Sequence, residues 1–300
     1  MGVKGKIGLI GLAVMGANLA RNLAGHGIST VVYNRSRDKT ENFLKEFGSD
    51  TNLSGAAALE ELVNSLEKPR KIILMIKAGE AVDAMIAKLI PLLEKDDILI
   101  DGGNSFFEDT RRRSREMEAL GVHFVGMGVS GGEEGALHGP SLMPGGTREA
   151  YDALAPILKA VSAKAEGEAC VDYMGPDGAG HYVKMVHNGI EYADMQMIAD
   201  TYFVMKNVLG MTAEEMADTW ETWNKGELSS YLVEITARIL RKADEMTGKP
   251  LVDVILDVAK QKGTGRWTSM SALELGVPAP TITEAVFARN VSSRKQERLI

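Results

Sequence analysis

Short apolar segments alternate with helix-length segments through the first half of the chain. The apolar segments cover residues 6–10, 30–33, 71–76, 98–101, 123–126 and 169–174. Such a rhythm is typical of repeated strand–helix–strand units, in which a mainly parallel sheet is covered by helices on both faces. The pattern therefore predicts an α/β fold that begins with a Rossmann-type doubly wound sheet.

The alternation stops after the turn sequence Gly-Pro-Asp-Gly at residues 175–178. Beyond it the apolar residues follow helical spacing, and no strand pattern is convincing. Thr212 and Glu215 have the spacing of a capping box that opens a helix through Trp223, and another helix is predicted over 232–240. We therefore expect a Rossmann-type domain at residues 1–177 and an all-helical domain at residues 178–300.

A glycine-rich loop joins the first predicted strand to a helix. Gly11 permits a tight turn, the small Ala13 lets the backbone approach a pyrophosphate, and Gly16 lets the helix pack closely on the strand. The alternative is an ordinary glycine-rich turn of a doubly wound fold, but the strand before the loop and the helix after it favour a nucleotide site. The residues predicted to bind a dinucleotide here are Gly11, Leu12, Ala13, Val14, Met15 and Gly16.

The end of the second predicted strand indicates which dinucleotide binds. NAD sites commonly place an acidic residue there to bind the ribose 2′-hydroxyl, whereas this chain has Asn34, Arg35 and Ser36. The Arg35 guanidinium can pair with a 2′-phosphate and stack on adenine, while Asn34 and Ser36 donate hydrogen bonds. The sequence predicts NADP as the cofactor; the alternative is a surface arginine near a turn.

Three loops after later strands, at residues 75–79, 101–105 and 128–132, are rich in small residues. Ligands of open α/β sheets bind beyond the carboxyl ends of the strands. Paired glycines let backbone N–H groups reach a ligand, and Asn104 and Ser130 add side-chain donors. Structural turns alone remain an alternative for one such loop, less easily for three. We assign four residues of these loops to the cofactor: Ile76, Lys77, Ala78 and Asn104.

A polar stripe is predicted on the helix that follows the domain boundary. Its members stand at offsets of three, four and seven residues, so they occupy one arc ~100° wide. The other faces are apolar, and burying lysine and glutamate without partners costs several kcal/mol. The stripe is therefore expected to face a cavity or a ligand; the alternative is a solvated stripe with an ion pair. Its members are Lys184, His187, Asn188 and Glu191.

Composition and charge narrow the possible functions. The chain has 300 residues, is 45% hydrophobic and 25% charged, and carries a net charge of −7, which argues against binding to nucleic acid or to an anionic membrane surface. Its single cysteine, Cys170, indicates a reducing compartment, and no apolar stretch reaches the ~20 residues of a membrane span. We expect a cytoplasmic protein without a bound metal, and we interpret the basic residues 111–113 as a solvated helix face.

Taken together, these segments resemble the decarboxylating 6-phosphogluconate dehydrogenases over essentially the whole chain. The resemblance implies NADP-dependent oxidation of 6-phosphogluconate at C3 and loss of CO2 to give ribulose 5-phosphate, in the pentose phosphate pathway and gluconate utilisation. It implies no metal. The most specific segments are residues 180–192 and 262–267; the others are 11–16, 34–36, 101–105, 128–135 and 139–146.

The resemblance also implies roles for individual residues. Lys184 would act first as a base on the 3-hydroxyl and then as an acid to the keto oxygen, and Glu191 would protonate C1 of the enediol. The sugar acid would be held by Asn104, Ser130, Gly131, Gly132, His187 and Asn188. The phosphate would be held by Tyr192, Lys262, Thr264 and Arg289, although Lys262 and Arg289 could instead be surface cations near helix ends.

The resemblance further implies that the helical domain binds substrate and mediates a homodimer. Family chains continue past the position of Ile300 into a tail that crosses to the partner subunit, so we expect that this chain lacks the tail. Three alternatives remain: a non-decarboxylating β-hydroxyacid dehydrogenase, a non-catalytic NADPH-binding fragment, and a hydrolase whose nucleophile elbow would lie at residues 128–132. Against the hydrolase, further glycines stand where a helix should begin.

Overall fold

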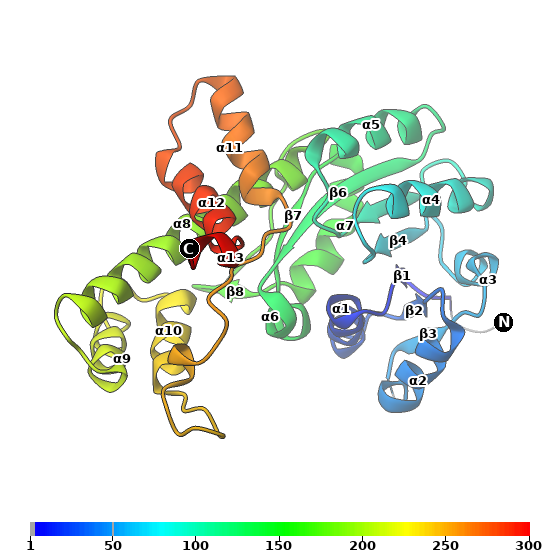
Figure 1. The fold of residues 1–300 in the computed structure, drawn as a ribbon. Coiled ribbons are helices and arrows are strands. Elements are labelled where there is room, and N and C mark those ends of the chain that lie inside the picture. The colour runs from blue at the N-terminus through cyan, green and yellow to red at the C-terminus, as the bar shows by residue number, and fades with distance from the viewer. Residues whose placement is uncertain (1–3, 50) are drawn as a thin grey trace. The chain divides into compact units, whose positions relative to one another are not determined.

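The computed structural model describes residues 4–49 and 51–300 and divides into two compact units, Met1–Met185 and Val186–Ile300. Helix α8 (Ala179–Asn207) is continuous through the division (Figure 1). The predicted domain boundary after residue 177 precedes this helix.

The first unit contains a seven-stranded sheet with the strand order β3-β2-β1-β4-β5-β6-β7. Strands β1 to β6 are parallel, and β7 runs antiparallel to β6. The order reverses at β1, which pairs with β2 on one side and β4 on the other, as in a doubly wound fold. The predicted Rossmann-type sheet is therefore confirmed. The strands are β1 (Ile7–Ile10), β2 (Thr30–Tyr33), β3 (Leu53–Gly55), β4 (Lys71–Leu74), β5 (Ile98–Asp101), β6 (His123–Ser130) and β7 (Ser141–Pro144).

Helices cover both faces of this sheet (Figure 1). Successive strand residues point to opposite faces, so Leu9 packs into one core and Ile10 into the other. Because both faces are buried, the parallel strands are almost continuously apolar, which explains the pattern in the sequence. One core involves α1 (Val14–Gly25), α2 (Arg37–Phe47) and α7 (Arg148–Val161); the other involves α3 (Leu59–Asn64), α4 (Glu80–Leu89) and α5 (Phe107–Glu118).

The strand predictions fail at the short edge elements. The predicted strand over 169–174 is wrong, because only β9 (Glu168–Ala169) forms there and it pairs with β8 (Lys164–Ala165) outside the main sheet. Val171 adds one isolated bridge to Leu142. The pattern missed β3, which is three residues long and contains Ser54 and Gly55, and the four-residue β7, which follows Gly139 and Pro140.

The second unit is helical. Besides the rest of α8 it contains α9 (Ala213–Trp223), α10 (Tyr231–Arg241), α11 (Thr264–Leu275), α12 (Pro280–Ser292) and α13 (Lys295–Arg298). The predicted capping box is confirmed, because Glu215 N donates to Thr212 Oγ1 at 3.2 Å and Thr212 N donates to Glu215 Oε2 at 2.8 Å. Helices α9 and α10 form a core together with Met205 of α8; its other buried members are Met216, Ala217, Trp220, Val233, Ala237 and Leu240. Among residues 4–49 and 51–300, no helix combines the length and apolar character needed to cross a membrane.

Candidate active site

The glycine loop brings the start of α1 tightly against β1. Gly11 has a φ of 105°, and a β-carbon there would strike the carbonyl oxygen of Met75; a β-carbon at Gly16 would strike the carbonyl oxygen of Gly11. Helix α1 begins after Ala13, which has no side-chain acceptor for the first N–H groups, and its first turn has no acidic side chain. These N–H groups and the helix dipole suit a pyrophosphate.

An arginine without an ion pair to the described residues, Arg35, follows the end of β2. Asn34 is already engaged, since its Oδ1 accepts from Leu12 N at 3.1 Å and its Nδ2 donates to the Ser36 carbonyl at 3.2 Å. Arg35 is exposed and makes no hydrogen bond or ion pair with the described residues, whereas Arg37 is paired with Glu41 at 2.6 Å. The glycine cradle and the Arg35 guanidinium together fit a phosphorylated dinucleotide.

The loops after β4 and β5 lie beside the glycine loop. A β-carbon at Gly11 would come within 2.9 Å of Ile76 Cγ2, and one at Gly103 would come within 3.3 Å of the Ile76 carbonyl oxygen. Lys77 and Asn104 are exposed and form no hydrogen bond within the part of the chain that the structure describes. The structure therefore brings these predicted cofactor residues to one edge of the sheet.

The first turns of α8 pack on glycines of β6. A β-carbon at Gly128 would lie 2.5 Å from Lys184 Cβ, and one at Gly126 would lie 2.8 Å from His181 Nδ1. Glycine in a strand marks such close approach. Lys184 is only 6% exposed. Because alternate residues share a face of a strand, Ser130 belongs to the same face of β6 as Gly126 and Gly128.

The prediction that residues 128–132 form a loop after the strand is wrong for residues 128–130, because β6 extends through Ser130. The turn consists of Gly131 and Gly132, whose φ angles are 118° and 62°. A helix, α6 (Gly132–His138), does follow, contrary to our expectation. In a nucleophile elbow the strained backbone conformation belongs to the nucleophile itself. Here the residue with a positive φ directly after the strand is Gly131 and not Ser130, so the turn does not fit an elbow with Ser130 as nucleophile.

In the second unit, predicted substrate residues gather where α8, α11 and α12 meet. Asn188 Nδ2 donates to Thr264 Oγ1 at 3.3 Å, and the Arg289 guanidinium lies 3.8 Å from the centroid of the Tyr192 ring. A β-carbon at Gly265 would come within 2.7 Å of the Tyr192 ring. Arg289 also donates to the Lys260 carbonyl at 2.7 Å, so its guanidinium is held in place. Lys262 stands two residues before the first residue of α11.

The polar stripe of α8 carries Lys184 in the first unit and its other members in the second. His187 Nδ1 lies 3.9 Å from Glu191 Oε2 and 3.3 Å from Asn188 Oδ1. The apolar faces of this helix are only partly buried: Met185 is 1% exposed, whereas Val183 is 37% and Ile190 51% exposed. Helical spacing placed the stripe correctly along one helix, but apolar residues elsewhere on that helix do not ensure their burial.

Comparison with known proteins identifies the family. A family model described as the NAD binding domain of 6-phosphogluconate dehydrogenase matches residues 6–175, and one described as the 6-phosphogluconate dehydrogenase C-terminal domain matches residues 180–300. The chain belongs to the 6-phosphogluconate dehydrogenase family. The resemblance stated from the sequence is therefore confirmed.

Individual members of the 6-phosphogluconate dehydrogenase family match nearly the whole chain. An NADP(+)-dependent, decarboxylating enzyme of Bacillus subtilis (strain 168) is 63% identical over 296 residues, which cover 99% of this chain and 63% of that protein. A decarboxylating enzyme of Staphylococcus aureus (strain Mu50) is 59% identical over 98% of this chain and 63% of that protein. A solved structure of the Plasmodium falciparum enzyme superposes with a TM-score of 0.94 at 48% identity, covering 98% of this chain and 63% of the other. This chain thus spans 63% of the length of these 6-phosphogluconate dehydrogenases.

Two buried polar residues were not predicted from the sequence. The interpretation of residues 111–113 as a solvated face is wrong for Arg113, which is 1% exposed and bonds Asp83 through its Nε at 2.8 Å. His181 is fully buried, and its Nδ1 lies 2.7 Å from Thr110 Oγ1. Burial lowers the pKa of His181, while the Asp101 carboxylate and the carbonyl groups of Asp101 and Gly103 oppose that shift.

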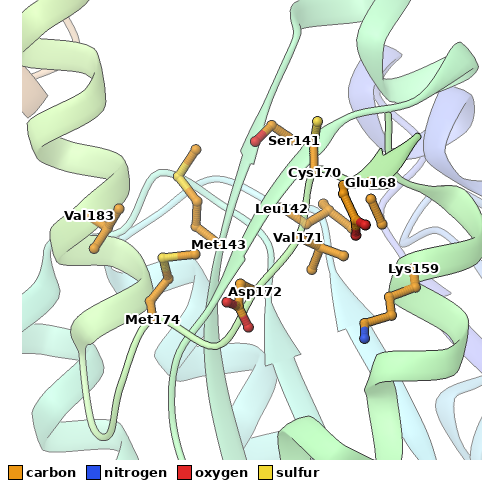
Figure 2. A pocket seen from close by; sticks show the side chains of 11 residues that line it. Ser141, Leu142, Met143, Lys159, Glu168, Cys170, Val171, Asp172, Met174 and Val183 are labelled. Carbon is orange, nitrogen blue, oxygen red and sulfur yellow. The ribbon is translucent and has the colours of Figure 1, made fainter. Parts of the chain in front are cut away.

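A cavity of about 520 Å³ lies along β7 and the segment that leads to α8 (Figure 2). Met143, Met174 and Val183 line one side, while Lys159 and Glu168 lie on the other (Figure 2). It contains no residue that the sequence assigned to the cofactor or the substrate of a 6-phosphogluconate dehydrogenase. Within the described residues, no three His, Cys, Asp or Glu side chains are grouped closely enough to hold a metal ion.

Proposed function

We propose that this chain catalyses the NADP-dependent oxidative decarboxylation of 6-phospho-D-gluconate to D-ribulose 5-phosphate, CO2 and NADPH. The observation that carries the proposal is the burial of Lys184 against Gly128, in the same unit as a glycine loop that fits a phosphorylated dinucleotide. A buried amine in the unit that carries the dinucleotide site suits proton transfer to and from a hydroxyl that is being oxidised. The names of the relatives support the same reaction.

The cofactor site would be formed by residues of the first unit. The N–H groups at the start of α1 would bind the pyrophosphate, and Arg35 would pair with the 2′-phosphate. Backbone groups of Ile76, Lys77 and Ala78, together with Asn104, would border the nicotinamide side of the site. When bound, NADP would accept the hydride from C3 of the substrate.

Lys184 and Glu191 would handle the protons of the two chemical steps. Lys184 Nζ would take the proton of the 3-hydroxyl during oxidation and return a proton to the keto oxygen as the carboxylate leaves as CO2. Glu191 would then protonate C1 of the enediol. An ammonium beside the keto oxygen also stabilises the charge that develops when electrons move onto it.

The substrate would be held at its two ends by different sets of residues. The sugar acid would contact Asn104, Ser130, Gly131, Gly132, His187 and Asn188. The phosphate would bind near the start of α11, where Thr264 and Lys262 neighbour the stacked pair of Arg289 and Tyr192. A guanidinium fixed over an aromatic ring presents its remaining donors to an anion with little loss of side-chain entropy.

We also propose that the protein acts as a homodimer in the cytoplasm. The homodimer rests on the family resemblance. The cytoplasmic location rests on the single cysteine, Cys170.

The proposal is tested by the absorbance of reduced nicotinamide after mixing the protein with 6-phosphogluconate and either NADP or NAD. We expect NADPH and CO2 in equal amounts, and loss of turnover but retained NADP binding in Lys184→Met. Lys159→Met, the same change at an exposed lysine of the same unit, is the matched control. NADPH without CO2 would instead identify a non-decarboxylating dehydrogenase, and cofactor binding without turnover in the unaltered chain would identify a binding fragment.

A further inference from the structure

Arg113 lies buried on α5, between two loops that follow neighbouring strands. Its neighbours Arg111 and Arg112 form ion pairs with Glu108, Asp177, Asp83 and Glu116 and keep substantial exposure. Arg113 is 1% exposed instead. A guanidinium so thoroughly removed from water needs charged or hydrogen-bonding partners, because burying an unpaired charge is costly.

One side of the Arg113 guanidinium holds the loop after β4. Nε donates to Asp83 Oδ1 at 2.8 Å, and Nη2 donates to Asp83 Oδ2 at 3.0 Å and to the Gly79 carbonyl at 3.1 Å. Gly79 is the residue before α4 and has a φ of 88°. The bidentate pair with Asp83 fixes the start of α4, and the bond to Gly79 fixes the end of loop 75–79. The hydrogen bonds from Arg113, the largest cause, and from Arg112 lower the pKa of Asp83 to about 2, while burial opposes the shift.

The other side of the guanidinium faces the loop after β5. Asp101 is 0% exposed, and its carboxylate accepts from Ser105 Oγ at 2.6 Å and from Gly103 N at 3.0 Å. These two bonds close loop 101–105 and thereby set the position of Asn104. Arg113 Nη1 lies 3.6 Å from Asp101 Oδ2 and has no hydrogen-bond partner among the described residues, so charge attraction connects it to this loop.

We propose that Arg113 is a positioning residue that couples loop 75–79 to loop 101–105, so that the two loops present their ligand-facing residues to NADP as one unit. This proposal rests on the proposed cofactor. The coupling runs from Gly79 and Asp83 through Arg113 to Asp101, and these four residues form the Arg113 link. The loops also touch directly, where Gly103 lies against the Ile76 carbonyl.

The test compares Arg113→Lys with Arg112→Lys in the full chain. Lysine keeps the charge but loses the fork that spans both carboxylates. Arg112 also bonds Asp83, at 2.9 Å, but reaches neither loop, so it is the matched control. The first readout is hydrogen exchange of backbone amides without ligand. We expect exchange in loops 75–79 and 101–105 to quicken by about tenfold in Arg113→Lys only, with the glycine loop 11–16 unchanged.

The second readout is the dissociation constant for NADP by titration calorimetry. We expect it to rise by about tenfold in Arg113→Lys and to stay unchanged in Arg112→Lys. Unchanged exchange in either loop, or loosened loops with unchanged NADP affinity, would overturn the proposal. If the unaltered chain binds no NADP, the proposed cofactor is wrong, and so is the proposal that Arg113 positions the loops for NADP. Faster exchange of both loops in Arg113→Lys would then support only the mechanical coupling between them.

A second pair of variants covers the case in which Arg113→Lys does not fold. Asp101→Asn keeps the shape of the side chain but removes the charge that faces Arg113. Backbone amides of both loop 75–79 and loop 101–105 are therefore expected to exchange faster. Ser105→Ala removes one bond inside loop 101–105 and leaves the Arg113 link intact, so loosening is expected in that loop alone. The same response to both substitutions would contradict the coupling.

Discussion

The β-carbon of Lys184 lies 2.5 Å from the position that a β-carbon would occupy at Gly128. The absence of a side chain at Gly128 of β6 therefore allows Lys184 to be buried against the sheet. Gly126, two residues earlier on the same face of β6, accommodates His181 in the same way. The register between β6 and α8 thus depends on two strand glycines.

Gly128→Ala is expected to displace Lys184. The clash involves Cβ and Cγ of the lysine, 2.5 and 2.9 Å away, and not the flexible end of the side chain, so the helix or the strand must shift. We expect kcat to fall by about a hundredfold, as for a displacement of ~1 Å at a catalytic group. NADP affinity should change little, because two strands, β4 and β5, separate β6 from β1, which carries the glycine loop. Gly25→Ala, where an added β-carbon meets nothing within 4 Å, is the control. Equal losses of kcat in the two variants would contradict this account.

Arg35→Gln is expected to reduce discrimination between NADP and NAD. Loss of a charge-assisted pair with the 2′-phosphate should raise KM for NADP by about tenfold or more, with KM for NAD nearly unchanged. Arg37→Gln removes the same charge two residues along the chain, where the guanidinium is already held by Glu41. Steady-state kinetics with both cofactors measure the effect. A preference for NADP that survives Arg35→Gln would refute the assignment of the 2′-phosphate site.

The central strands were predictable from sequence because burial on both faces makes them continuous apolar runs. Strands β1, β2 and β5 were predicted within one residue of their bounds. Strands β3 and β7 were not, since Ser54, Gly55 and Pro144 lack strand propensity and only pairing with a neighbour makes these segments extended.

The candidate site was predictable only where local spacing carries the information. The glycine loop and the arc that begins at Lys184 are patterns within one loop and one helix. The burial of Arg113 and His181 depends on partners far away in the chain, Asp83 and Thr110, which no local pattern reveals. Arg289 was selected among 34 basic residues by resemblance alone.

Arg289→Gln is expected to weaken binding of 6-phosphogluconate and leave NADP binding unchanged. The substitution removes both the cation stacked on Tyr192 and a charge available to the phosphate. KM for 6-phosphogluconate should rise by about tenfold or more, because one charge-assisted hydrogen bond is worth ~1.5–3 kcal/mol. Arg294→Gln, which breaks only the exposed pair with Glu297, is the control. If KM for 6-phosphogluconate rises equally in both variants, the phosphate is not held by Arg289 in particular.

The burial of His181 is expected to make stability depend on pH. Its pKa is lowered in the folded protein, so the folded chain binds fewer protons than the unfolded chain, in which the histidine titrates near its ordinary value of ~6.5. The stability that a neutral His181 contributes is therefore fully present above pH ~6.5 and is lost as the pH falls toward the lower pKa of the folded state. The free energy of unfolding falls there by up to ~1.4 kcal/mol per pH unit.

The measurement is the free energy of unfolding in urea at pH 8, 6.5 and 5.5. His181→Asn keeps a polar atom near the position of Nδ1, which faces Thr110, but cannot be protonated, so its stability should fall less between pH 6.5 and 5.5 than that of the unaltered protein. His26→Asn, at the exposed end of α1, is the matched control and should follow the unaltered protein. Nearby Asp101 acts against the shift and Arg113 adds to it, so the Asp101→Asn variant should steepen the loss. If the free energy of unfolding falls equally with pH in the unaltered protein and in His181→Asn, this histidine is protonated without cost in the folded protein.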